Sequence, residues 1–150
     1  MKTAFGSPVL DAACRLLVPF MLLFALYVIA HGHYSPGGGF QGGTIIAAVM
    51  IMIRLVRGRE TIWGLQRLGA LRLASCGVGL YAGIGCLSLF FAGNYLDYSK
   101  LPLPLEGGAL RAAGSFGVEV GVALGVAGVL VLIFDALTAW EDEETTEHVE

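Results

Sequence analysis

The stretch from His31 to Gly43 reads HGHYSPGGGFQGG and lies between two apolar segments that are each long enough to enter a lipid bilayer. Five of the seven residues from Gly37 to Gly43 are glycine. Glycine loses more conformational freedom on folding than any other residue, so this density is expected where helices turn sharply and another backbone comes close. Irregular backbone at membrane depth is tolerated only where protein or water covers it. The stretch therefore predicts a short hairpin between two membrane helices, in a chain that does not stand alone in the bilayer.

The composition of the chain is that of a membrane protein. Of its 150 residues, 56% are hydrophobic and only 14% are charged, and the mean hydropathy is +0.75. Soluble domains carry about 25% charged residues. We therefore expect an all-α integral membrane protein whose four transmembrane helices form one bundle, over residues 16–30 (extending back toward Asp11), 40–55, 73–92 and 114–137. Residues 1–140 would form this domain, and residues 141–150 an acidic, disordered cytoplasmic tail.

The arginines indicate how the chain crosses the membrane. Short cytoplasmic loops carry an excess of Lys and Arg. The loop between the first two predicted helices has neither, whereas the segment between the second and third contains Arg54, Arg57, Arg59, Arg67 and Arg72. We therefore expect both termini in the cytoplasm and the glycine-rich stretch on the outer side. Residues 58–73 form either a short amphipathic helix along the interface or a plain loop.

Glu119 is the one carboxylate well inside a predicted membrane helix. A charge at this depth is costly, and such residues usually mark an ion path or a paired site. His31 and His33 close the first helix on the outer side, where a contact with Glu119 would tune both groups for proton exchange. A proton or cation relay and a purely structural acid both remain open for Glu119. Asp135, near the inner end of the same helix, is expected to reach headgroups and water.

Small residues recur at every fourth position in two predicted helices, as Gly117, Gly121 and Gly125 in the fourth and as Ser75, Gly79 and Gly83 in the third. Such stripes let helix backbones approach each other, which drives association where lipid offers no hydrophobic gain. Packing within the chain's own bundle and docking on another subunit both fit, and two stripes in a four-helix chain favour docking. At about 100° per residue, Glu119 points about 200° away from Gly117, so the acid and the stripe should face different neighbours.

Other chemistries lack support in the sequence. Gly37, Gly39 and Gly42 match G-x-G-x-x-G, but a dinucleotide site needs a preceding strand in a βαβ unit. The two histidines have no third ligand of Cys, Asp or Glu type nearby, and the three cysteines form no C-x-x-C pair. We therefore expect no metal site, no cofactor and no disulfide. No catalytic triad has supporting context, and the basic loop is too short to indicate binding to nucleic acid.

The segment from His33 to Gly43, HYSPGGGFQGG, resembles the G-H-x-x-P-G-G-G-F-x-G-G signature of the MnhB- or MrpB-like subunits of the multisubunit Na+/H+ antiporters. Residues 116–123, FGVEVGVA, are similar to the acidic segment near the start of that family's last helix, and residues 101–104, LPLP, to its outer loop. Some members carry a Lys in the outer loop near the place of Gly107-Gly108, and many have Asp in place of Glu119. The resemblance marks as structural residues of the turn Pro36, Gly37, Gly38, Gly39, Phe40, Gly42 and Gly43.

The resemblance implies a small integral subunit of a cation/proton antiporter in the cell (plasma) membrane of a prokaryote. Its expected partners are other membrane subunits, the lipid bilayer and Na+ and/or H+. Its expected role is to support assembly and to line an ion path with Glu119. Two alternatives stay open: the same module in a membrane-bound, redox-driven pump of the energy-converting hydrogenase type, and a purely structural scaffold. The chain itself is expected to catalyse no covalent reaction.

Overall fold

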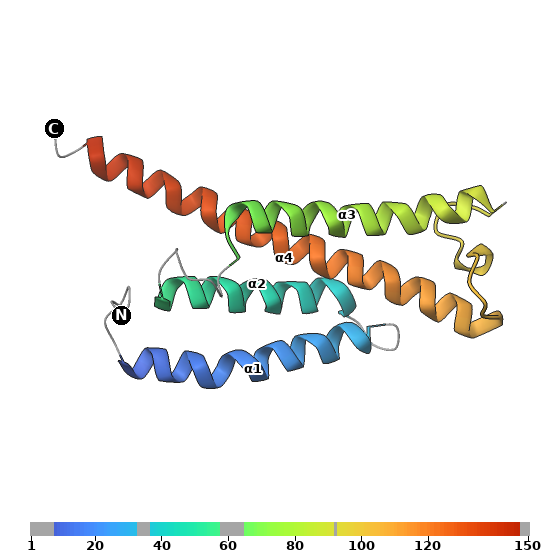
Figure 1. Ribbon diagram of the computed structural model, residues 1–150, viewed down its shortest axis with the longest axis horizontal. Helices are drawn as coiled ribbons and strands as arrows, with labels where there is room; N and C mark the ends of the chain where they lie inside the picture. Colours follow the sequence, from blue (N-terminus) through green and yellow to red (C-terminus); the bar gives the residue numbers. More distant parts are fainter. Residues whose placement is uncertain (1–7, 33–36, 58–64, 92, 148–150) are drawn as a thin grey trace.

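The computed structural model describes residues 8–32, 37–57, 65–91 and 93–147, and within these ranges the chain forms four α-helices and no strand (Figure 1). The helices are α1 (Pro8–Ala30), α2 (Gly38–Arg57), α3 (Arg67–Phe90) and α4 (Gly107–Glu147), and a short 3₁₀ helix, η1 (Tyr98–Lys100), precedes α4. All four α-helices are long and apolar enough to cross a membrane. The predicted all-α membrane fold with four spans is therefore confirmed.

Each helix begins before the span expected from hydropathy, and α4 also extends furthest beyond the end of its span. Its 41 residues correspond to about 60 Å, twice the thickness of a hydrocarbon core of about 30 Å. The expectation of a disordered tail is wrong for the backbone of residues 141–147, which continues α4. The sequence has no glycine or proline after Gly128, so nothing in it stops the helix where the apolar stretch ends.

The glycine-rich stretch is mostly the first turn and a half of α2 rather than a loop, because this helix begins at Gly38. Only two of its glycines adopt a backbone conformation that side chains disfavour, with φ of +126° at Gly37 and +36° at Gly38. The glycines that follow are helical and buried. Because these glycines have no side chain, neighbouring helices can pack closely on them. One short segment therefore provides both the turn before α2 and the contact of α2 with its neighbours.

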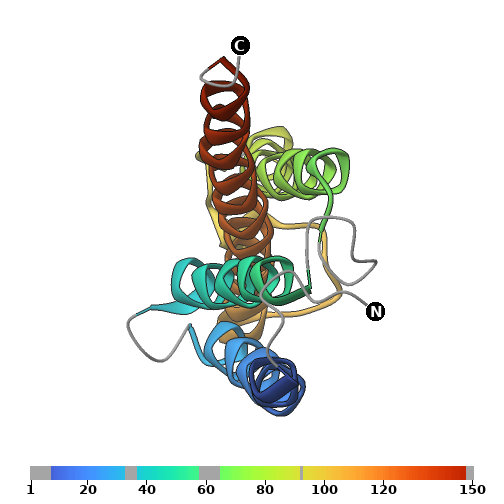
Figure 2. The same ribbon diagram turned by 90° about the vertical axis from the view of Figure 1, so that its left-hand side faces the viewer.

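The helices pack side by side in the order α1–α2–α4–α3 (Figures 1 and 2). The end-on view places α1 and α3 on opposite sides of the α2–α4 pair (Figure 2). In the most apolar 18-residue segment of each helix, 44% of α2 is buried, compared with 17% of α1 and 22% of α3. This is expected for an inner helix that lies between outer ones. The bundle that the sequence predicts is therefore an open row of helices.

The glycine stripe of α4 packs on α3 of the same chain. A Cβ added to Gly77 of α3 would lie 2.6 Å from the carbonyl oxygen of Gly121, and one added to Gly117 would lie 2.8 Å from the side chain of Ile84. Gly117 and Gly121 of this stripe therefore serve packing within the chain, whereas a Cβ on Gly125 would meet nothing within 4 Å. The stripe of α3 behaves differently, because a Cβ on Gly79 or Gly83 would meet nothing within 4 Å.

Candidate functional site

The carboxyl group of Glu119 lies where three helices meet. Glu119 is on α4, and its Oε2 atom is hidden from solvent. A Cβ added to Gly32, just after α1, would overlap this oxygen, and one added to Gly38, the first residue of α2, would lie 3.1 Å from it. Gly32 and Gly38, which are described on either side of residues 33–36, therefore both lie against the end of the Glu119 side chain. Glycine is required at Gly32 because a Cβ there would also overlap the Cα atom of Gly38, which is backbone and cannot move aside as a side chain can.

Glu119 holds this position because α2 and α4 touch through their backbones. A Cβ on Gly39 would overlap the carbonyl oxygen of Glu119 itself, and one on Gly43, a turn later, would lie 2.6 Å from the carbonyl oxygen of Ala123. Gly42 faces the other way, toward the side chain of Ile29 on α1. Small residues on two faces of α2 thus let it pack closely on both α1 and α4, and this packing holds the Glu119 carboxyl group beside Gly32 and Gly38. Glu119 faces α2 whereas the glycine stripe faces α3, so the expectation that they have different neighbours is confirmed.

A second ionisable pair lies at the opposite end of the α2–α4 contact. Nη1 of Arg54 is 2.7 Å from Oδ1 of Asp135, and the two side chains are only 5% and 8% exposed. The expectation that Asp135 reaches headgroups and water is therefore wrong, and Arg54 is not part of a solvated loop. The contact is an ion pair without hydrogen-bond geometry, since neither Nη1 nor Oδ1 has a hydrogen-bond partner among the described residues.

The contact between these two polar positions is apolar. Glu119 and Asp135 are 16 residues apart, or about 24 Å along α4. Small buried residues on the two helices along this length include Gly43 and Ala47 on α2, and Ala123, Ala127 and Val131 on α4. An open hollow of about 300 Å³ also lies between the two helices toward Asp135, and its lining includes Ala47, Ile51, Ile133 and Phe134. An apolar stretch of α2 and α4 therefore lies between Glu119 and Asp135.

Comparison with known proteins fits this arrangement. Residues 9–132 match the family described as a domain related to the MnhB subunit of Na+/H+ antiporter. The chain belongs to the MnhB family. It is 28% identical over 131 residues to a Na(+)/H(+) antiporter subunit of Bacillus subtilis, and the match covers 86% of this chain and 91% of that protein. It is also 30% identical over 132 residues, 87% of this chain and 93% of the relative, to a protein of Staphylococcus haemolyticus provisionally named antiporter subunit mnhB2.

The other candidate residues of this MnhB domain are spread around the turn. The ring of His31 packs on Tyr27 of α1, with 4.3 Å between ring centroids. Phe40, on the first turn of α2, is 62% exposed and points away from the core. His33 and Pro36 lie outside the described residues. Within the described ranges no three His, Cys, Asp or Glu side chains gather as a metal site.

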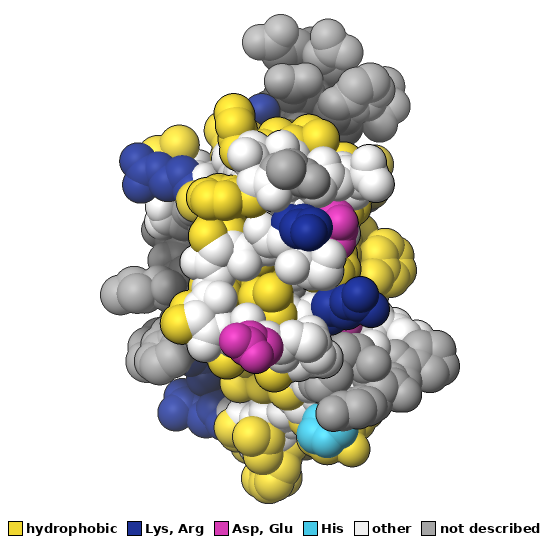
Figure 3. Space-filling model, turned by 90° about the vertical axis from the view of Figure 1, so that its right-hand side faces the viewer, with side chains coloured by type: hydrophobic (Ala, Val, Ile, Leu, Met, Phe, Trp, Pro, Cys, Tyr) yellow, Lys and Arg dark blue, Asp and Glu magenta, His cyan; other side chains and the backbone are white. Residues whose placement is uncertain are grey.

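The end of the MnhB domain that carries this turn has few charges. Figure 3 shows a few separate basic and acidic side chains there, with apolar and neutral surface between them. Asp97, in the loop before η1, accepts hydrogen bonds from the hydroxyl and the backbone N–H of Ser99, at 2.6 and 3.1 Å. The hydroxyl hydrogen bond holds the pKa of Asp97 below its ordinary value. This acid therefore caps η1, and Glu119 is the acid that the helix packing buries at this end.

Sequence reasoning identified Glu119 and missed the Arg54–Asp135 pair. In the sequence, Arg54 is interpreted as one of the five arginines that mark the cytoplasmic side. A usable signal was present, because Arg54 and Asp135 are each followed by apolar residues that continue a helix. When two neighbouring membrane helices each carry a charge near the same side of the membrane, and the charges are opposite, the two residues are candidates for a buried pair.

Proposed function

We propose that this chain is an integral membrane subunit of a multisubunit Na+/H+ antiporter, and that Glu119 lines its cation or proton path. The observation that carries the role of Glu119 is the burial of its carboxyl oxygen at the junction of α1, α2 and α4. Burial of an ionisable group within a membrane span is costly, and it is a common mark of ion paths. The backbone contact of α2 with α4 at Gly39 and Gly43, and the apolar residues beyond it, support exchange with the outer side or with a neighbouring subunit, rather than along this subunit alone.

The proposal includes the orientation of the chain. The start of α1, the end of α2 and the start of α3 lie toward the same side of the molecule (Figure 1), and this side carries Arg15, Arg57, Arg67 and Arg72. The opposite end has Lys100 and Arg111. Because basic residues concentrate on the cytoplasmic side, we infer that both termini are cytoplasmic and that Glu119 is nearer the outer side. A fluorescent protein fused to the C-terminus should be fluorescent, whereas a phosphatase fused there should be inactive.

Substitution of Glu119 by Gln tests the proposed path. Gln has nearly the same shape and fills the space beside Gly32 and Gly38, but it cannot release a proton. We expect the complex to assemble and its initial rate of antiport in everted membrane vesicles to fall by at least about tenfold, equivalent to about 1.4 kcal/mol in the barrier. Glu106→Gln is the matched control, because Glu106 is exposed just before α4, and it should leave the rate unchanged.

Two outcomes would contradict this role. Full antiport by Glu119→Gln with normal assembly would make the acid structural. Loss of assembly in Glu119→Gln, with normal assembly in Glu106→Gln, would indicate that the charge holds the fold rather than moves an ion. His31 and His33 remain candidates for the same path, and His31→Gln and His33→Gln should each lower the rate if they exchange protons with it.

The partners can be identified by purifying the tagged chain in mild detergent and analysing the co-purified proteins by mass spectrometry. We expect other antiporter subunits, in roughly equal amounts with this chain. Nickel–iron hydrogenase or iron–sulfur subunits in the same preparation would instead indicate the redox-driven complex. Recovery of the chain alone, from membranes whose other complexes stay intact, would contradict a subunit role.

A further inference from the structure

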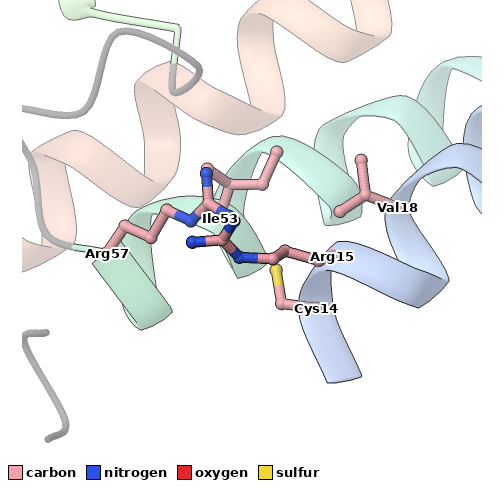
Figure 4. Close-up of a pocket in the computed structure, with 5 residues that line it drawn as sticks. All are labelled: Cys14, Arg15, Val18, Ile53 and Arg57. Atoms are coloured by element: carbon pink, nitrogen blue, oxygen red, sulfur yellow. The ribbon is translucent and has the colours of Figure 1, made fainter. Parts of the chain in front are cut away.

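A cavity of about 170 Å³ lies between α1 and α2 at the end where α1 begins and α2 ends. Cys14, Val18 and Ile53 provide its apolar lining, and Arg15 and Arg57 its charged part. Figure 4 shows the two arginine side chains extending toward each other, Arg15 from α1 and Arg57 from α2. The cavity thus combines apolar walls with two guanidinium groups that can reach the same ligand.

Among the described residues, Arg15, Arg57 and the Asp11 carboxylate that both contact leave an excess of one positive charge. Asp11 accepts a hydrogen bond from Nε of Arg15 at 2.8 Å and another from Nε of Arg57 at 3.0 Å. Each guanidinium has five N–H groups, so most of them are not used by Asp11. The side chains of Arg15 and Arg57 are 60% and 23% exposed, and they are accessible from outside. The shared carboxylate orients the two guanidiniums without neutralising both.

The depth of the cavity in the membrane indicates its ligand. Arg57 is the last residue of α2 and Arg15 is in the second turn of α1, and arginine side chains near helix ends extend to the membrane interface. The guanidiniums are therefore at the level of the lipid headgroups, with Val18 and Ile53 on the hydrocarbon side. Arginines favour phosphate because two parallel N–H groups match two phosphate oxygens. A lipid phosphate, unlike a free one, also brings apolar groups to the walls.

We propose that this cavity binds an anionic phospholipid such as phosphatidylglycerol, with its phosphate on Arg15 and Arg57. The glycerol and the start of the acyl chains contact Cys14, Val18 and Ile53. Basic pockets between membrane helices on the cytoplasmic side commonly bind anionic headgroups in this way. The proposal needs the chain to lie in a membrane, but it does not depend on the role of Glu119. Failure of the Glu119 test would therefore leave it intact.

Native mass spectrometry of the purified complex, titrated with phosphatidylglycerol or with phosphatidylcholine, tests the site. We expect the wild type to retain phosphatidylglycerol in preference to phosphatidylcholine. The double variant Arg15→Gln/Arg57→Gln should lower phosphatidylglycerol occupancy by about tenfold or more, from the usual effect of basic residues near an anionic surface. Arg72→Gln is the matched control, because this arginine is exposed on α3 at the same end and does not line the cavity.

A second variant keeps the test decisive if the arginine variant does not assemble. Val18→Phe fills part of the cavity, leaves both arginines in place and should also lower the occupancy. Unchanged phosphatidylglycerol binding in Val18→Phe and in any arginine variant that assembles would overturn the proposal. So would equal binding of phosphatidylcholine, or displacement of the lipid by millimolar inorganic phosphate. A photo-crosslinker at position 18 should label lipid, and labelling of a neighbouring subunit instead would also overturn it.

Discussion

Gly39→Ala should abolish assembly of the complex that contains this chain. The added Cβ would overlap the carbonyl oxygen of Glu119 and lie 2.8 Å from its carbonyl carbon. Both are backbone atoms inside a helix, so neither can move aside as the end of a flexible side chain would. The helices α2 and α4 would have to separate, at a cost of about 3 kcal/mol, the upper part of the range for overpacking. The amount of complex recovered with a tagged partner subunit measures the loss.

Gly79→Ala is the control for this experiment. Gly79 is also a helical glycine, on α3, but a Cβ there would meet nothing within 4 Å. In that variant we expect normal assembly, since alanine favours a helix over glycine. Wild-type recovery of the Gly39→Ala complex would show that α2 and α4 do not touch as described. A loss confined to Gly79→Leu, with Gly79→Ala normal, would indicate that another subunit packs on this face of α3.

Asp135→Val should destabilise the subunit by about 3 kcal/mol, because removal of one partner of a buried ion pair leaves the other charge uncompensated. Arg54 is only 6% exposed and has no hydrogen-bond partner for Nε among the described residues, so the surrounding protein offers little compensation. The temperature at which the subunit leaves the purified complex should fall accordingly. Glu106→Val, at an exposed acid, should have little effect by comparison.

The double variant Arg54→Met/Asp135→Val gives the sharper result. Replacing both members of a buried pair by apolar residues is often neutral or stabilising, so the double variant should recover most of the stability that Asp135→Val loses. A double variant no more stable than Asp135→Val would mean that the two residues do not interact. A stable Asp135→Val variant would mean that Arg54 reaches water or another partner.

The glycine pattern of this sequence predicted the hairpin but did not identify the helix of this chain that comes close to it. Five glycines in seven residues indicated close approach of another backbone, and that backbone belongs to α4 of the same chain. A stripe of small residues indicates that another helix comes close, but it does not indicate which helix this is. The order α1–α2–α4–α3 depends on how residues far apart in the sequence meet, which local periodicity does not encode.

The burial of the charged residues was predicted correctly for Glu119 and incorrectly for Arg54 and Asp135, for a similar reason. Glu119 stands in a long apolar run, so its depth follows directly from counting residues. Arg54 and Asp135 stand near span ends, where a side chain reaches either water or a neighbouring helix. Their burial follows from the packing of α2 on α4, which brings the two charges to the same level. The cavity beside Arg15 and Arg57 is likewise formed by α1 and α2 together, so it cannot be predicted from either helix alone.

The open row of helices has a consequence for how transport activity depends on gene expression. The described helices form a row and not a closed ring, so an ion path lined by this subunit would need a second wall from another protein. The rate of transport in a cell should then follow whichever subunit is scarcest. Overproduction of this chain alone should add no activity, and an excess copy would compete for partners and dilute complete complexes with partial ones.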